Sequence, residues 1–154
     1  MCSTSSPKSP KSTESSNAAT VTTKIETSGI HHLGLTIPDI KQTSDFFIEQ
    51  LNFKKVGEVP AYPAIFVSDG TVMLTLWQIK DTENTVKFDR TKNVGLHHFA
   101  LKVNTIEQLN ALYQNLLKLE DVEIEFAPEA LGDSPFVHMM CLIPGGVRLE
   151  LISE

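Results

Sequence analysis

One stretch of eight residues occurs twice in this chain and strongly limits how the chain can fold. Residues 96–103 read LHHFALKV and residues 30–37 read IHHLGLTI, so a histidine pair and the pattern after it are repeated. The match continues without a gap, because Ile106 stands in the second copy where Ile40 stands in the first. Self-similarity at a constant spacing indicates a duplicated supersecondary unit. Two copies are too few for a solenoid, so we interpret them as two modules that close on one another.

Both copies alternate with a period of two residues, which is typical of a half-buried strand. Large apolar residues occupy one set of alternate positions, and small or polar residues occupy the other. His32 and His98 fall on the small and polar faces, so one histidine from each copy is predicted to face the same open space. His31 and His97 fall on the apolar faces, where we expect a buried imidazole bonded to the backbone or supporting a ligand from behind.

Each module is expected to contain a strand, a helix and three further strands, which together make an α+β fold. One helix is predicted after Asp39, which can cap it, and the other after Thr105 or Asn104. Asp69-Gly70 between two apolar runs predicts a hairpin. The predicted strands cover residues 30–37, 53–59, 62–68 and 71–79 in the first module and 95–103, 122–127, 136–143 and 147–152 in the second.

The chain is expected to divide into a tail and one two-module domain. Residues 1–28 are rich in Ser, Thr, Lys and Pro, so burial cannot offset the entropy of ordering them and a disordered tail is predicted. A mitochondrial transit peptide is the alternative, but the tail has no Arg and carries Glu14 and Glu26. The domain is predicted at residues 29–154, with modules at 29–79 and 95–154 and a polar linker at 80–94.

Composition limits the partners of the chain. The net charge of −6 lacks the basic footprint of a nucleic-acid-binding protein. No apolar run approaches the roughly 18 residues that span a membrane. Cys2 lies in the tail and Cys141 in a predicted strand, so we expect no disulfide framework and a reducing, cytoplasmic compartment.

The last predicted strands of the two modules also align, since VMLTL in the first matches VRLEL in the second. This alignment makes Thr75 the counterpart of Glu150, and by alternation Glu150 faces the same space as His32 and His98. Two imidazoles and one carboxylate on a concave face can bind a divalent metal and leave positions open for substrate or oxygen. Each residue alone is more often structural or solvated, so the prediction depends on their convergence.

Three other side chains are predicted to line the same space. His138 faces it by alternation, either as an acid–base or substrate-contacting residue or as a satisfied residue of the wall. Trp77 shares a face with Thr75, and the two are predicted to form a substrate wall in which the indole stacks on a ligand or fills the wall.

These motifs resemble those of the vicinal oxygen chelate superfamily, which includes glyoxalase I, bleomycin-resistance proteins, fosfomycin-resistance thiol transferases, methylmalonyl-CoA epimerase and extradiol dioxygenases. The resemblance covers residues 29–154 and is carried by HHLGLTIPD at 31–39, GLHHFAL at 95–101 and PGGVRLEL at 144–151. It implies two βαβββ modules forming a curved mixed sheet around a metal-binding cup, with the helices outside. It also implies that His32, His98 and Glu150 hold the metal.

The resemblance implies a small metal-dependent enzyme that stabilises an oxyanion or enediolate of a small oxygenated substrate, as a lyase, isomerase, transferase or dioxygenase. The metal would be Fe, Mn, Zn, Ni or Co. The alternative is a non-catalytic small-molecule-binding protein of the bleomycin-resistance type. A homodimer is also expected, by likeness to members that complete the cup across a two-fold axis. Resemblance to glyoxalase I implies a site with four ligands, one of them an acidic residue at the position of Thr75. Because threonine replaces that residue here, the sequence argues against glyoxalase isomerisation.

Overall fold

The computed structural model describes residues 24–154 and contains two units of the same element order, which confirms the predicted α+β fold of two βαβββ modules. The tail predicted at residues 1–28 lies almost wholly outside the described residues. The first unit comprises β1 (Leu33–Ile37), α1 (Ile40–Leu51), β2 (Lys54–Val59), β3 (Ala64–Ser68) and β4 (Met73–Gln78). The second unit comprises β5 (Phe99–Lys102), α2 (Ile106–Leu116), β6 (Glu123–Ala130), β7 (Val137–Ile143) and β8 (Val147–Ser153).

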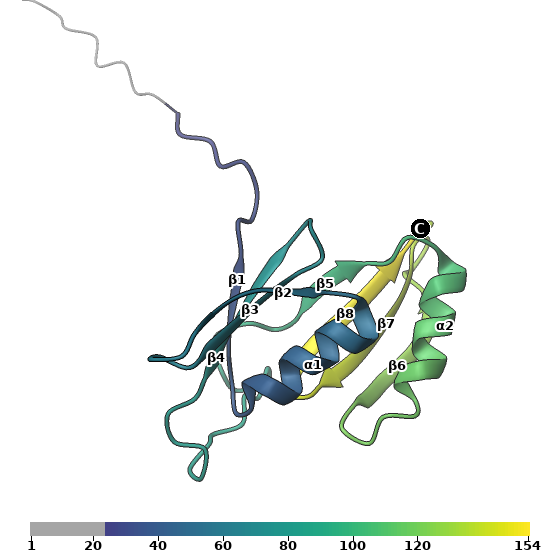
Figure 1. Cartoon of the computed structure of the whole chain (residues 1–154). Helices are drawn as coiled ribbons and strands as arrows, with labels where there is room; N and C mark the ends of the chain where they lie inside the picture. The colour runs from purple at the N-terminus through teal and green to yellow at the C-terminus, as the bar shows by residue number, and fades with distance from the viewer. Residues whose placement is uncertain (1–23) are drawn as a thin grey trace, which may run out of the picture.

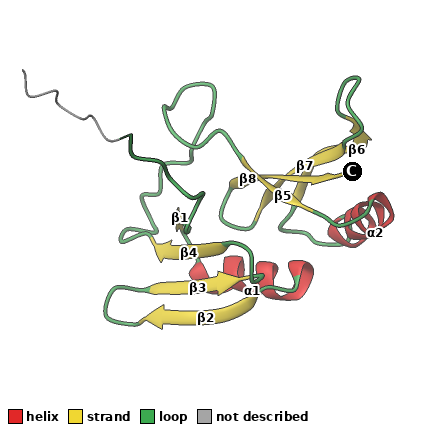
Figure 2. Ribbon diagram, turned by 90° about the horizontal axis from the view of Figure 1, so that it is seen from above, coloured by secondary structure: helices red, strands yellow, loops and turns green. Residues whose placement is uncertain are grey.

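Each unit forms its own four-stranded mixed sheet, with the strand order β1-β4-β3-β2 in the first and β5-β8-β7-β6 in the second. The first strand of each unit pairs in parallel with the last, and the other pairs are antiparallel. The two sheets lie beside one another, with α1 packed on β3 and β4 and α2 packed on β6 and β8 (Figures 1 and 2). Each sheet therefore has one face covered by a helix and one face turned away from it.

The strand register makes Thr75 and Glu150 structural counterparts. Thr75 lies opposite Gly34 across the β1–β4 pair, and Glu150 lies opposite Ala100 across the β5–β8 pair. Neighbours in register point to the same face of a sheet. Thr75 and Glu150 therefore both project from the face that carries no helix.

The strands begin later than the repeated sequence predicts. β1 starts at Leu33 and β5 at Phe99, so both histidine pairs precede the strands. The parallel pairing begins only at Leu33↔Leu74 and Phe99↔Leu149. The period-two argument therefore does not reach the histidines. The burial predicted for His31 and His97 is wrong, because both are exposed.

One core joins the two units. The helix-facing side chains of both sheets pack with the apolar stripes of both helices into a single buried cluster. Its fully buried members include Phe47, Val67, Leu74, Leu76, Leu109, Leu116, Met139, Cys141, Leu149 and Leu151. The turn between β7 and β8 contacts α1 directly, since the hydroxyl of Thr43 donates a 3.0 Å hydrogen bond to the carbonyl of Pro144.

The helix boundaries follow the capping signals in the sequence. The carboxylate of Asp39 accepts the amide of Gln42 at 3.0 Å, and α1 ends at Asn52 in the left-handed conformation with φ of 56°. Thr105 is the N-cap of α2 and accepts the amide of Gln108 at 3.2 Å, which decides between the two caps that the sequence allows. Among residues 24–154 no helix is long and apolar enough to cross a membrane.

Candidate metal centre

Glu150 is the centre of a polar cluster on the open face of the second sheet. One carboxylate oxygen, Oε2, lies 3.1 Å from Nε2 of His98, and the other, Oε1, lies 2.6 Å from Nδ1 of His138. The Glu150 side chain is 12% exposed, that of His138 14%, and that of His98 34%. Three elements therefore bring two imidazoles to one nearly buried carboxylate.

The chemistry of this cluster suits part of a metal shell. Zinc, for example, binds imidazole nitrogen and carboxylate oxygen at about 2.0–2.2 Å, which places neighbouring ligands about 3 Å apart. Nε2 of His98 and Oε2 of Glu150 have that separation. His138 holds the second oxygen of Glu150 by a hydrogen bond, as residues behind a metal ligand commonly do. The ring of Phe126 also packs against His138 in a tilted arrangement, with centroids 5.0 Å apart.

His32 does not join this cluster within one chain. It belongs to the first unit, where its Nδ1 lies 2.9 Å from Nδ1 of its neighbour His31. Between residues 24 and 154 no group of three or more His, Cys, Asp or Glu side chains is placed to hold a metal ion. One chain therefore brings together two of the three predicted ligands, His98 and Glu150, and does not place His32 beside them.

The predicted wall residues Thr75 and Trp77 lie on the open face of the first sheet. The hydroxyl of Thr75 accepts the indole N–H of Trp77 at 3.0 Å, and Thr75 is only 4% exposed. Gly34 makes room for this pair, since a Cβ there would lie 3.3 Å from the Thr75 hydroxyl. Tyr62 and Phe66 pack against the indole with ring centroids 5.5 and 5.8 Å away. This face is therefore an aromatic wall in which the Thr75 hydroxyl is already bonded.

Two charged residues that sequence reasoning missed border the cluster in the second sheet. Arg148 on β8 donates through Nε to both oxygens of Glu125 at 2.9 Å, and its Nη2 lies 2.7 Å from the same carboxylate. This bonding to Arg148 holds the pKa of the Glu125 carboxyl below its usual value. The signal for Arg148 was its alternation with Glu150, two residues along the same strand. Glu125 gave no signal, because it is the extra residue of a β-bulge between Ile124 and Phe126.

His97 connects this ion pair to His98. Its Nδ1 lies 2.8 Å from Nδ1 of His98 and 3.4 Å from Nη1 of Arg148. Desolvation and, next, the positive charge of Arg148 lower the pKa of His97. His97 thus links the Glu125–Arg148 ion pair to His98 and is not the buried core residue that the alternation predicts.

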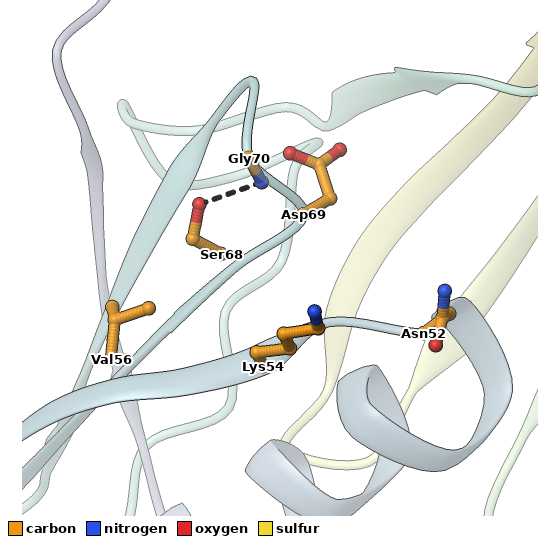
Figure 3. A pocket seen from close by; sticks show the side chains of 6 residues that line it. All are labelled: Asn52, Lys54, Val56, Ser68, Asp69 and Gly70. Atoms are coloured by element: carbon orange, nitrogen blue, oxygen red, sulfur yellow. Dashed lines mark hydrogen bonds between the residues drawn. The ribbon is translucent and has the colours of Figure 1, made fainter.

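A separate hollow lies at the edge of the first sheet (Figure 3). It has a volume of about 280 Å³ and is lined by Asn52, Lys54, Val56, Ser68, Asp69 and Gly70. Its Gly70 amide donates to the Ser68 hydroxyl at 3.0 Å, as Figure 3 shows. None of the predicted site residues lines it, so the hollow, which lies between the start of β2 and the β3–β4 turn, is not part of the candidate centre.

Comparison with known proteins agrees with this architecture. The model of the "Glyoxalase/Bleomycin resistance protein/Dioxygenase superfamily" matches residues 29–151. The chain is similar to a glyoxylase/bleomycin resistance protein/dioxygenase domain from Frankia sp. EAN1pec, with a TM-score of 0.69, 22% identity, and coverage of 83% of this chain and 93% of that one. None of the curated proteins compared with the chain matches it.

Two more solved structures share the fold at lower identity. Lactoylglutathione lyase from Agrobacterium tumefaciens has a TM-score of 0.61 and 18% identity, with coverage of 82% of this chain and 94% of that one. The fosfomycin resistance protein FosX from Listeria monocytogenes has a TM-score of 0.65 and 14% identity, with coverage of 84% and 95%. The two-unit mixed-sheet fold thus defines the class of protein. The chain belongs to the glyoxalase, bleomycin resistance protein and dioxygenase superfamily.

Proposed function

We propose that this protein is a metal-dependent enzyme that acts on a small oxygenated substrate, with His98 and Glu150 as two of its metal ligands. The observation that carries the proposal is the 3.1 Å approach of His98 Nε2 to Glu150 Oε2 on an open sheet face. A divalent ion held there would act as a Lewis acid toward vicinal oxygens of the substrate and stabilise an oxyanion or enediolate. The candidate ions are Fe, Mn, Zn, Ni and Co, which elemental analysis of the purified protein distinguishes.

His32 is proposed as the third ligand, contributed by a second copy of the chain. Within one chain it does not reach His98 and Glu150, and both sheets keep one face free of helices. A two-fold homodimer in which the first sheet of one copy faces the second sheet of the other would bring His32 of one copy to His98 and Glu150 of its partner. The aromatic wall around Trp77 would then close the cup over the ligands.

His138 is proposed as the acid–base residue of the site. It is bonded to Glu150 Oε1, so it lies next to the ligands without itself being one of the proposed three. A positioned imidazole is the commonest side chain for proton transfer near neutral pH.

A reducing, cytoplasmic setting is part of the same proposal. It is supported by Cys141, which is buried and free, and burial raises the pKa of its thiol to about 12.

Metal analysis of purified variants tests the proposal. Wild-type protein should bind about one divalent ion per chain, and His98→Ala or Glu150→Gln should abolish binding because each removes one of few protein ligands. Glu123→Gln is the matched control, since it neutralises an exposed carboxylate of β6 on the same sheet. Equal metal content in Glu150→Gln and Glu123→Gln would disprove the proposed centre.

A non-catalytic ligand-binding protein is the second candidate, favoured by the aromatic wall of Tyr62, Phe66 and Trp77. Such walls hold flat or apolar ligands by stacking and need no metal. Trp77 is the single tryptophan of the chain, so quenching of protein fluorescence reports directly on ligands that reach it. Quenching that is unchanged by a chelator would favour this candidate over the enzyme.

A further inference from the structure

A continuous chain of polar contacts runs from the bulge of β6 to the candidate metal ligands. Glu125 holds Arg148 by three contacts of 2.7–2.9 Å, and the side chains of this pair are only 17% and 13% exposed. Arg148 then reaches Nδ1 of His97 at 3.4 Å, and His97 reaches Nδ1 of His98 at 2.8 Å. The far nitrogen of His98 faces Glu150.

The chemistry of these groups fixes the direction of each hydrogen bond. A guanidinium offers only N–H groups and positive charge, so at 3.4 Å Arg148 disfavours a proton on Nδ1 of His97, whose single lone pair is then left for the shorter contact to His98. The short contact to His98 then requires that Nδ1 of His98 carries the proton and donates it to His97. In a neutral imidazole with Nδ1 protonated, Nε2 keeps its lone pair. This arrangement favours the tautomer of His98 whose free nitrogen points at Glu150.

The free nitrogen is the one that a metal would use. Nε2 of His98 and Oε2 of Glu150 would both be electron-pair donors at 3.1 Å, an arrangement that a shared cation stabilises. The other oxygen of Glu150 is occupied by His138 at 2.6 Å, which leaves Oε2 for this role. The protonation of His98 at Nδ1 and the bond from His138 to Oε1 thus leave Nε2 of His98 and Oε2 of Glu150 as the two atoms available to a cation.

The first unit lacks this arrangement and serves as an internal comparison. Its histidines make the same Nδ1 to Nδ1 contact, at 2.9 Å between His31 and His32. The counterpart of Arg148 is Met73, because Arg148 precedes Leu149 and Met73 precedes Leu74, the first residues of the two parallel pairings on these strands. β2 carries the same kind of bulge as β6, between Lys55 and Gly57, and its extra residue is an apolar valine. The bulge is therefore present in both units, but only in the second is its extra residue a carboxylate that pairs with an arginine on the last strand.

We propose that Arg148, anchored by Glu125, is a positioning residue that sets the tautomer and ring orientation of His98 through His97. This role rests on the proposed metal function, because the selected nitrogen matters only if it binds a ligand. The polar partners of Arg148 in the described residues are Glu125 and His97, so Arg148 acts on His98 through His97 and is not a catalytic residue.

Long-range ¹H–¹⁵N NMR of the imidazoles in the metal-free full-length protein tests the tautomer directly. His98 should be protonated at Nδ1 in the wild type, whereas Arg148→Met, which installs the counterpart from the first unit, should give a mixture of tautomers. Lys102→Met is the matched control, because it removes an exposed cation from the same sheet. If Arg148→Met does not fold, Glu125→Gln carries the test, since it keeps the shape of the anchor and weakens its hold on Arg148.

Zn²⁺ titration supplies the second readout. Arg148→Met should weaken Zn²⁺ binding by roughly 10-fold or more, the usual effect of losing a residue behind a metal ligand. Arg148→Lys should restore it only in part, because an ammonium cannot hold Glu125 and His97 in one plane. If Arg148 were only structural, Arg148→Met would lower the melting temperature but leave the His98 tautomer unchanged. That result would overturn the inference. So would a His98 protonated at both nitrogens in the wild type.

The two proposals fail in different ways. A wild-type protein that binds no Zn²⁺ would end the metal function, while an Arg148-dependent tautomer would still stand as a property of the fold. Wild-type Zn²⁺ binding with no effect of Arg148→Met on tautomer or affinity would end the positioning role alone.

Discussion

The hydroxyl of Thr43 on α1 donates to the carbonyl of Pro144, at the turn between β7 and β8, across 3.0 Å. This buried bond joins the helix of the first unit to the last hairpin of the second. The next residue, Gly145, has φ of +97°, and a Cβ there would lie 2.9 Å from the Thr43 hydroxyl and 3.2 Å from Cγ2 of Ile37. The two units therefore meet at a turn that requires glycine for both its conformation and its space.

Gly145→Ala should destabilise the protein by about 2–4 kcal/mol, because it adds a steric clash to the backbone strain of about 1–3 kcal/mol. Gly146→Ala is the control, since its φ of +75° is also positive but nothing lies within 4 Å of its added methyl. Urea unfolding should place Gly145→Ala clearly below Gly146→Ala. Equal stability of the two variants would mean that the turn is not pressed against α1.

The Glu125–Arg148 pair should make stability depend on pH in the acid range. The pKa of Glu125 is lowered in the folded protein, chiefly by hydrogen bonding to Arg148, from an ordinary value of 4.5. A lowered carboxyl pKa contributes stability that is present above the unfolded pKa and is lost as the pH falls through the folded pKa. The wild type should therefore be more stable than Glu125→Gln at pH 7, and the difference should shrink below pH 4.5. A difference that grows on acidification would reverse the assignment.

His138→Ala should weaken metal binding without abolishing it. His138 supports Glu150 through a 2.6 Å hydrogen bond and is not one of the proposed ligands. Loss of such support typically reduces affinity by about 10–100-fold, whereas His98→Ala removes a ligand outright. Calorimetric titration with Zn²⁺ separates the two effects. Complete loss of binding in His138→Ala would make His138 a ligand.

Isomerisation of the hemithioacetal of methylglyoxal and glutathione should stay near the uncatalysed rate. Thr75 stands where the resemblance to glyoxalase I implies a carboxylate base; the residue is only 4% exposed, and its hydroxyl is bonded to the Trp77 indole. A steady-state assay with metal-loaded protein checks this. Robust turnover that a chelator abolishes would show that another residue, with His138 the first to examine, supplies the base.

The fold could be predicted well from the sequence because the duplication and the alternation both follow from paired strands that bury one face against a helix. Leu149 and Leu151 are fully buried against the helices, as alternation in the last strand requires. The equivalence of Thr75 and Glu150 follows from the same alignment and is present in the strand register. Both inferences concern residues inside paired strands, where period two holds.

The sequence failed where residues leave that regular pairing. His31 and His97 precede the first residues that pair, so alternation does not determine their exposure. Glu125 is the extra residue of a bulge, and a bulge shifts the alternation of everything beside it. The relation of His32 to His98 and Glu150 depends on how two sheets, or two chains, face one another, and no local pattern encodes that distance.

The most direct test of the proposed centre uses a heterodimer of two inactive chains. His32→Ala and Glu150→Gln chains, co-expressed with different tags and purified through both, would leave one complete set of ligands if His32 comes from the second copy. The heterodimer should then bind about one divalent ion, against about two for the wild-type dimer and none for either parent variant. A heterodimer without metal, or a His32→Ala protein with wild-type metal content, would contradict the shared centre.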